Sequence, residues 1–123
     1  METADQSQVT VGLAQIAPVW LDRKRTLQKV NAFIEQAAAR HCDLVVFGEA
    51  LVPGYPFWVE LTDGARFNSD LQKAIFAEYA SEAVRPGAGD LASVCATAAK
   101  NRIAVYLGTV ECAEDRGGHS VYC

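Results

Sequence analysis

The chain has 123 residues, a formal net charge of −4 and a hydrophobic content of 50%. This length suits one domain, so we expect residues 1–123 to form a single domain, and the apolar content excludes a disordered chain. The acidic balance argues against a nucleic-acid partner, and no apolar run approaches the roughly 18 residues that cross a membrane. The polar start, METADQSQ, resembles neither a signal nor a transit peptide, so a cytoplasmic location is expected.

The first 47 residues predict a strand, a helix and a second strand. Residues 9–16 (VTVGLAQI) alternate larger and small side chains as a strand does, and Asp22 is a candidate N-cap for a helix that starts near Arg23. We interpret the basic run 23–25 as a solvated first turn. Residues 44–47 (LVVF) predict a strand buried on both faces, which makes this segment a βαβ unit with parallel strands. The apolar face predicted for the helix comprises Leu27, Val30, Ile34, Ala37, Ala38 and His41.

Two more helices and two more strands are predicted after a turn-rich loop at residues 50–58 (ALVPGYPFW). Ser69 or Asp70 can cap a helix that extends to about residue 83, and Gly89-Asp90 can start another that ends at Asn101. The predicted remainder is a strand over 103–111, a polar turn over 114–118 and a final strand over 119–123. The inward-facing residues predicted for the two helices are Leu71, Ala74, Ile75 and Tyr79, then Leu91, Val94, Cys95 and Ala98.

The cysteines and histidines do not form a metal-binding pattern. No two cysteines have the CxxC spacing, and the two histidines do not complete a zinc motif, so we expect no metal site. Cys42, Cys95 and Cys112 are interpreted as free thiols, and Cys95 as a packing residue of its helix. The complete set is Cys42, Cys95, Cys112 and Cys123 with His41 and His119.

A candidate site lies just after the second strand. Glu49 follows Phe47 by two residues, and in open α/β sheets sites form beyond the carboxyl ends of the strands. A partly desolvated carboxylate there can accept a proton from a nucleophile, and Gly48 before it would permit close backbone approach. The alternative is an acid that caps the loop or pairs with a buried base. Candidate substrate-binding residues are Tyr55, Phe57 and Trp58, which would give an apolar wall for a small organic ligand, or else a plug under the loop or an oligomer contact.

Three segments carry a resemblance to a known family: VTVGLAQIAPVWLD, DLVVFGEALVPGYPFW and GTVECAEDRGGHSVYC. In this order they resemble the nitrilase branch of the carbon–nitrogen hydrolase superfamily. The resemblance implies an α/β fold, the front part of an α–β–β–α sandwich with a βαβ start and a mixed sheet. It also implies hydrolysis of a nitrile or amide by a glutamate, a lysine and a cysteine, without a metal or organic cofactor. Glu49 matches the family's glutamate, the general base, and assembly into a homo-oligomer is expected by resemblance.

The chain departs from the family pattern in two respects. Gly48 stands where the family commonly has proline, and no lysine or cysteine of the chain matches the catalytic pair, which in the family follows the fourth strand. We therefore expect the front part of a longer protein, inactive alone, that converts a nitrile to a carboxylic acid and ammonia when complete. The alternatives are a complete small domain with a short final edge strand, an amidase or carbamoylase of the same superfamily, and a noncatalytic binding or assembly module.

Overall fold

The computed structural model describes residues 8–64, 66–116 and 120–123, with the side chains of 120–122 excepted. Three strands form a parallel sheet in the order β1-β2-β3, where β1 is Val11–Ala14, β2 is Leu44–Phe47 and β3 is Ala104–Tyr106. The helix α1 (Arg23–Ala39) joins β1 to β2, and the two strands pair in parallel with Val11 opposite Leu44. The α/β class and the predicted βαβ unit are therefore confirmed.

Helix α1 begins where the sequence predicts and ends earlier. The Asp22 side chain accepts a hydrogen bond from the Arg25 backbone N–H at 2.9 Å, as an N-cap does. The buried residues of α1 are Thr26, Leu27, Val30, Ile34 and Ala37. His41 is exposed with a left-handed φ of 60°, so the expectation that the apolar face extends to His41 is wrong: the chain has already left the helix at that point.

The segment between β2 and β3 contains three helices and a 3-10 turn: α2 (Trp58–Leu61), α3 (Asp70–Ser81), η1 (Pro86–Ala88) and α4 (Ala92–Asn101). Ser69 caps α3 as predicted, but Tyr79 is its only buried residue, and Leu71 is 57% exposed. The inward face predicted for α3 is therefore mostly wrong. The reason is that α3 lies below the parallel sheet and meets a small core cluster through Tyr79 near its C-terminal end.

Helix α4 also differs from the prediction at its start. Leu91 is the N-cap residue and makes no side-chain capping bond, whereas the Asp90 carboxylate accepts a hydrogen bond from the Arg85 backbone N–H at 2.8 Å. Val94 is buried as predicted, but Cys95 is exposed, so the packing role expected of this thiol is wrong. The helix ends at Asn101 as predicted.

The strand predicted over 103–111 is divided into two. β3 belongs to the parallel sheet, whereas β4 (Val110–Cys112) pairs antiparallel with β5 (Ser120–Tyr122) in a separate two-stranded sheet. Within the described residues the expected single mixed sheet is thus replaced by one parallel and one antiparallel sheet. The predicted polar turn falls partly on residues 117–119, which lie outside the described part of the chain.

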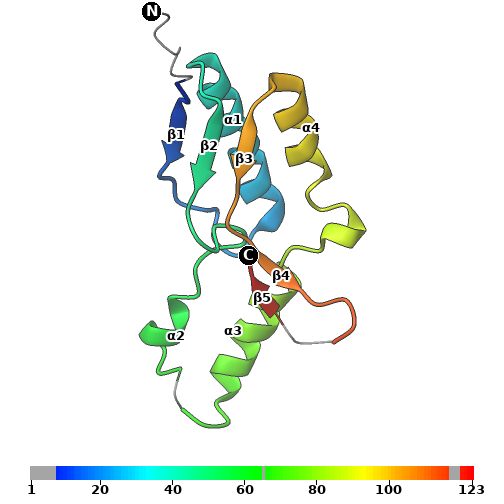
Figure 1. Ribbon diagram of the computed structural model, residues 1–123. Coiled ribbons are helices and arrows are strands. Elements are labelled where there is room, and N and C mark those ends of the chain that lie inside the picture. The colour runs from blue at the N-terminus through cyan, green and yellow to red at the C-terminus, as the bar shows by residue number, and fades with distance from the viewer. Residues whose placement is uncertain (1–7, 65, 117–119) are drawn as a thin grey trace, which may run out of the picture.

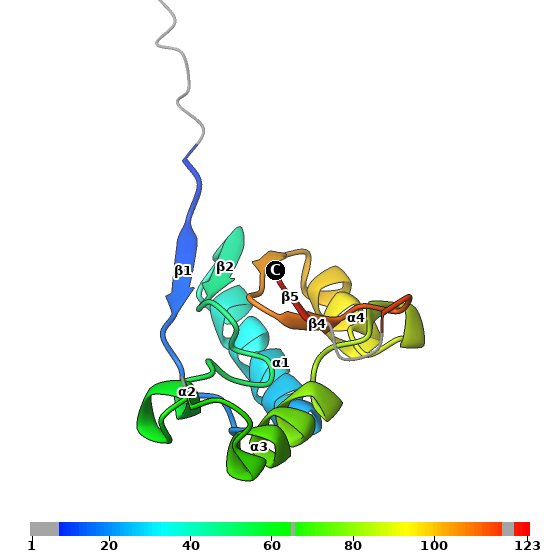
Figure 2. The same ribbon diagram turned by 90° about the horizontal axis from the view of Figure 1, so that it is seen from below.

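Among the described residues, helices cover one face of the parallel sheet and leave the other face bare. Figures 1 and 2 show α1 and α4 on the same side of the sheet, where Val45 and Phe47 of β2 join the main core. On the opposite face Val11, Leu13 and Tyr106 are 46%, 79% and 67% exposed. Among the residues described, no helix is both long enough and apolar enough to cross a membrane.

Candidate active site

Glu49 lies at the carboxyl edge of the parallel sheet, as the sequence predicts. Figure 1 shows the arrowheads of the three strands pointing toward α2 and α3, and Glu49 follows the end of β2 by two residues. The expected partial desolvation is not found, because the Glu49 side chain is exposed. The backbone accounts for this: Ala50 takes a left-handed φ of 50° and fills the buried position, with 0% exposure, which leaves Glu49 at the surface.

The backbone that carries Glu49 is held on one side by the segment between β3 and β4. We call residues 48–54 the Glu49 loop. The Val52 N–H donates to the Gly108 carbonyl at 3.3 Å, and the Val110 N–H donates to the Val52 carbonyl at 2.9 Å. A Cβ atom added at Gly108 would lie 2.2 Å from the Gly48 carbonyl oxygen, so the two backbones are in direct contact. Only glycine permits an approach of this kind.

The other end of the Glu49 loop is held by α3 and by the residues before α1. The Tyr79 hydroxyl donates to the Gly54 carbonyl at 2.8 Å in a buried hydrogen bond. The Leu21 N–H donates to the Pro53 carbonyl at 3.2 Å, and Val52, Pro53 and Gly54 are all buried. The position of Glu49 is therefore fixed by backbone contacts, although its side chain is free to meet a ligand.

The close backbone approach expected at Gly48 is present, but the residue that has to be glycine for it is Gly108. A Cβ atom added at Gly48 would meet nothing within 4 Å, whereas one added at Gly108 would meet backbone atoms of residues 48–50. Sequence reasoning missed Gly108 as a site residue because its partner is about sixty residues away. The one available signal was a glycine inside a predicted strand, which often marks a close backbone approach.

The three predicted substrate-binding residues do not share one surface. Tyr55 and Phe57 are 53% and 42% exposed, and Phe57 stacks on Trp20 with ring centroids 5.5 Å apart. Trp58 is buried and packs edge-on against Tyr79 at 6.1 Å. The geometry leaves the binding role of the three residues a prediction.

Trp58 nevertheless has a buried polar group without a hydrogen-bond partner among the described residues. Its indole Nε1 is buried and has no hydrogen-bond acceptor among the residues that the structure describes. A buried donor without a partner costs about 1–3 kcal/mol. An acceptor supplied by a ligand or an ordered water would remove this cost, which keeps Trp58 of interest as a site residue.

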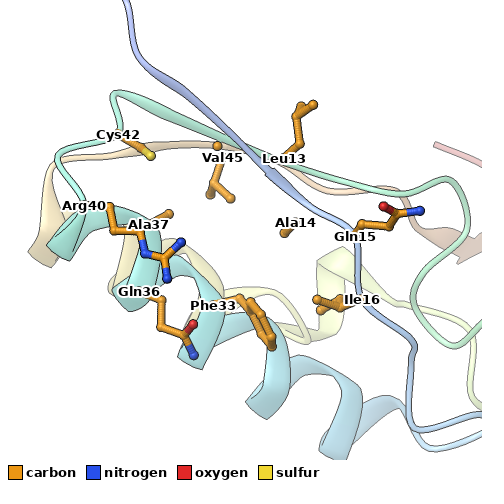
Figure 3. Close-up of a pocket in the computed structure, with 11 residues that line it drawn as sticks. Leu13, Ala14, Gln15, Ile16, Phe33, Gln36, Ala37, Arg40, Cys42 and Val45 are labelled. Carbon is orange, nitrogen blue, oxygen red and sulfur yellow. The ribbon is translucent and has the colours of Figure 1, made fainter.

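One cavity, of about 510 Å³, lies beside η1 and the end of β4, and two more lie beside the parallel sheet. Of these two, one, of about 340 Å³, lies between α1 and the edge strand β1, and Figure 3 shows Phe33, Gln36 and Arg40 along the helix side of it. The other, of about 330 Å³, lies between α4 and the strands β3 and β4, and its lining includes Cys95 and Cys123. None of these cavities is lined by Glu49 or by the three predicted aromatic residues. Within the described ranges, no group of three or more histidine, cysteine or acidic residues could hold a metal ion.

Comparison with known proteins identifies the family. The sequence profile of the carbon–nitrogen hydrolases matches residues 10–123. An arylacetonitrilase of Aspergillus oryzae is 32% identical over 90% of the chain and 31% of its own length. A protein named nitrilase 2, from an unknown prokaryotic organism, is 34% identical over 94% of the chain and 35% of its own length. Nitrilase 2 of Arabidopsis thaliana is 28% identical over 98% of the chain and 34% of its own length.

The chain thus spans about a third of the length of these curated relatives. The match nevertheless includes β1, the whole Glu49 loop and the segment that contacts it, which are the parts that form the candidate site. On this basis the chain belongs to the carbon–nitrogen hydrolase family, in its nitrilase branch.

Proposed function

We propose that the protein to which this chain belongs hydrolyses a nitrile to a carboxylic acid and ammonia, with Glu49 as the general base. The observation that carries the proposal is an exposed carboxylate at the carboxyl edge of a parallel sheet, on a loop fixed by backbone contacts. A catalytic base has to reach the proton that it accepts, and its position has to be reproducible. The relatives named nitrilase and arylacetonitrilase support the choice of a nitrile as substrate.

The proposed reaction begins with proton transfer. Glu49 takes the proton from a cysteine thiol, because a thiol is mostly protonated at neutral pH and the thiolate is the nucleophile. The thiolate attacks the nitrile carbon and the nitrogen is protonated, which gives a covalent thioimidate. Water adds to its carbon and ammonia leaves, which gives a thioester. A second water then releases the carboxylic acid and restores the thiol, and a lysine ammonium stabilises the anionic charge that develops in these steps.

The lysine and the cysteine of this set are proposed to follow Cys123 in the complete protein. The chain's own lysines support this, since they have partners elsewhere or are exposed on helices. The Lys29 ammonium donates to the Ala17 carbonyl at 2.7 Å, and the Lys100 ammonium lies 3.9 Å from the Glu35 carboxylate. Among the cysteines, Cys42 precedes β2 and therefore lies at the opposite end of that strand from Glu49.

The α–β–β–α sandwich is likewise a proposal for the complete protein. The bare face of the parallel sheet supports it, because exposed Leu13 and Tyr106 form an apolar surface that a second sheet would bury. Self-association is proposed by resemblance, and size-exclusion chromatography with light scattering on the full-length protein would test it.

The test of Glu49 is the variant Glu49→Gln in the full-length protein, which keeps the shape of the side chain and removes the base. We expect ammonia release to fall by about 10³-fold or more, with the folded structure preserved by circular dichroism. Glu78→Gln is the matched control, because Glu78 is exposed on α3 and lies outside the site. Retained turnover in Glu49→Gln would contradict the proposal and favour a noncatalytic role. Turnover of an amide in place of the matching nitrile would reassign the substrate and keep the base.

A further inference from the structure

We propose that Gly108 is a positioning residue. Because it has no side chain, the segment after β3 can pack directly against the Glu49 loop and fix its position. This inference rests on the proposed function of Glu49 as the base. Gly108 itself touches neither substrate nor thiol in this proposal, because it acts through the backbone of residues 48–50.

The contact is one of backbone against backbone. A Cβ atom at residue 108 would lie 2.2 Å from the Gly48 carbonyl oxygen, 2.8 Å from the Glu49 Cα and 2.9 Å from the Ala50 nitrogen. In proteins a Cβ atom essentially never lies within 3.0 Å of a heavy atom outside its own and the neighbouring residues. No rotamer change can relieve the overlap, because all three atoms belong to the main chain.

The surrounding hydrogen bonds prevent the two segments from separating freely. The Gly108 carbonyl accepts from the Val52 N–H, and the Val52 carbonyl accepts from the Val110 N–H, so Val52 bonds the two segments just after the contact. Before the contact they are held by the pairing of β2 with β3, in which Val46 lies opposite Tyr106. Ala50 is fully buried with a left-handed φ of 50°, a conformation that persists only where the surroundings impose it. Of the residues whose backbone contacts Gly108, Glu49 is the one that carries an exposed side chain.

A side chain at residue 108 would therefore move the base. Separating carbon and oxygen from 2.2 Å to an ordinary contact of at least about 3.3 Å requires a displacement of about 1 Å. A misplacement of about 1 Å at a catalytic group can cost about 10²-fold in rate. The loss would appear in kcat more than in KM, because the base acts in the chemical step.

The test compares three glycine-to-alanine variants of the full-length protein. Gly108→Ala introduces the contact with the Glu49 loop. Gly48→Ala is the matched control beside Glu49, since its Cβ would meet nothing within 4 Å. Gly12→Ala is the control for crowding elsewhere, since its Cβ would lie 3.1 Å from the Cys42 sulfur at the far end of the sheet. The readouts are kcat per active site, with the sites counted by burst titration, KM, and the thermal unfolding midpoint.

We expect kcat of Gly108→Ala to fall about 10²-fold per active site, with KM within about threefold of the wild type. If Gly108 had only a structural role, Gly108→Ala would lower the number of active sites and leave kcat per site unchanged. The same result is expected of Gly12→Ala. A kcat within about threefold of the wild type in Gly108→Ala, combined with an inactive Glu49→Gln, would overturn this inference and leave the proposed function intact. An active Glu49→Gln would instead overturn the proposed function.

A second variant keeps the proposal testable if Gly108→Ala does not fold. The double variant Gly108→Ala/Ala50→Gly gives the Glu49 loop the backbone freedom to yield, because glycine adopts a positive φ without strain. We expect it to fold and to remain about 10²-fold slower than Ala50→Gly alone. Equal kcat values for the double variant and for Ala50→Gly would overturn the positioning role.

Discussion

Replacing Arg23 with alanine would remove the side chain that connects three helical segments. Its guanidinium Nη1 donates to the Ser81 carbonyl at 3.2 Å and to the Ala83 carbonyl at 2.8 Å, and its Nε lies 3.4 Å from the Asp90 carboxylate. These contacts join the start of α1 to the end of α3 and to the turn before α4. The interpretation of Arg23 as part of a solvated first turn is therefore wrong, although Lys24 and Arg25 are exposed as expected.

The size of the effect follows from burial. The side chains of Arg23 and Asp90 are 25% and 19% exposed, so the ion pair alone contributes about 0–1 kcal/mol. Each hydrogen bond from a charged donor contributes about 1.5–3 kcal/mol, and the partial exposure lowers that value. We expect Arg23→Ala to lower the free energy of unfolding by about 2–4 kcal/mol. Lysine keeps the charge without the planar fork, so Arg23→Lys should recover less than half of the loss.

Urea unfolding of the full-length protein, followed by circular dichroism, measures these free energies. Arg25→Ala is the matched control, because the Arg25 side chain is 72% exposed and, within the described part of the chain, its one ion-pair partner is Asp22 at 3.9 Å. Its loss should stay within about 0.5 kcal/mol. A loss below about 0.5 kcal/mol in Arg23→Ala, or an Arg23→Lys as stable as the wild type, would refute the reasoning.

Two further predictions concern the Glu49 loop and the bare sheet face. Tyr79→Phe removes the donor to the Gly54 carbonyl, so we expect a loss of about 1–2 kcal/mol by urea unfolding together with a lower kcat for ammonia release, and unchanged values of both would contradict the part assigned to Tyr79. Leu13→Ser alters a side chain that is 79% exposed in this chain but would be buried in a sandwich. In the full-length protein it should cost about 2 kcal/mol by thermal unfolding, and a change within about 0.5 kcal/mol would contradict the proposed second layer.

The features that the sequence predicts correctly depend on local patterns. The period of apolar residues and the Asp22 cap define α1, and the apolar run defines β2. The expectation that β2 is buried on both faces is wrong for the described residues, because only Val45 and Phe47, on the face that the helices cover, are buried. Glu49 could be placed at the sheet edge because chain order alone sets it just after β2. Local signals of this kind need no knowledge of distant partners.

The features that the sequence misses depend on distant partners. The apolar residues of α3 predict a buried stripe, but the helix meets only a small core cluster, so the periodicity overstates its burial. The sequence predicts Arg23 to be a surface charge, because its partners at the end of α3 are distant in the chain. The division of the strand over 103–111 follows from the contact of Gly108 with the Glu49 loop, which the local β-propensity cannot indicate.

The Glu49 loop separates two requirements that compete in most catalytic groups. A side chain fixed by its own hydrogen bonds is precise but is engaged by them, whereas a free side chain is available but poorly placed. Among the described residues, no hydrogen bond or ion pair reaches the Glu49 carboxylate, and the contacts that hold its loop involve backbone groups from Gly48 to Gly54. Changes at Glu49 should therefore affect the reaction and spare the fold, whereas changes at Tyr79 or Gly108 should affect both.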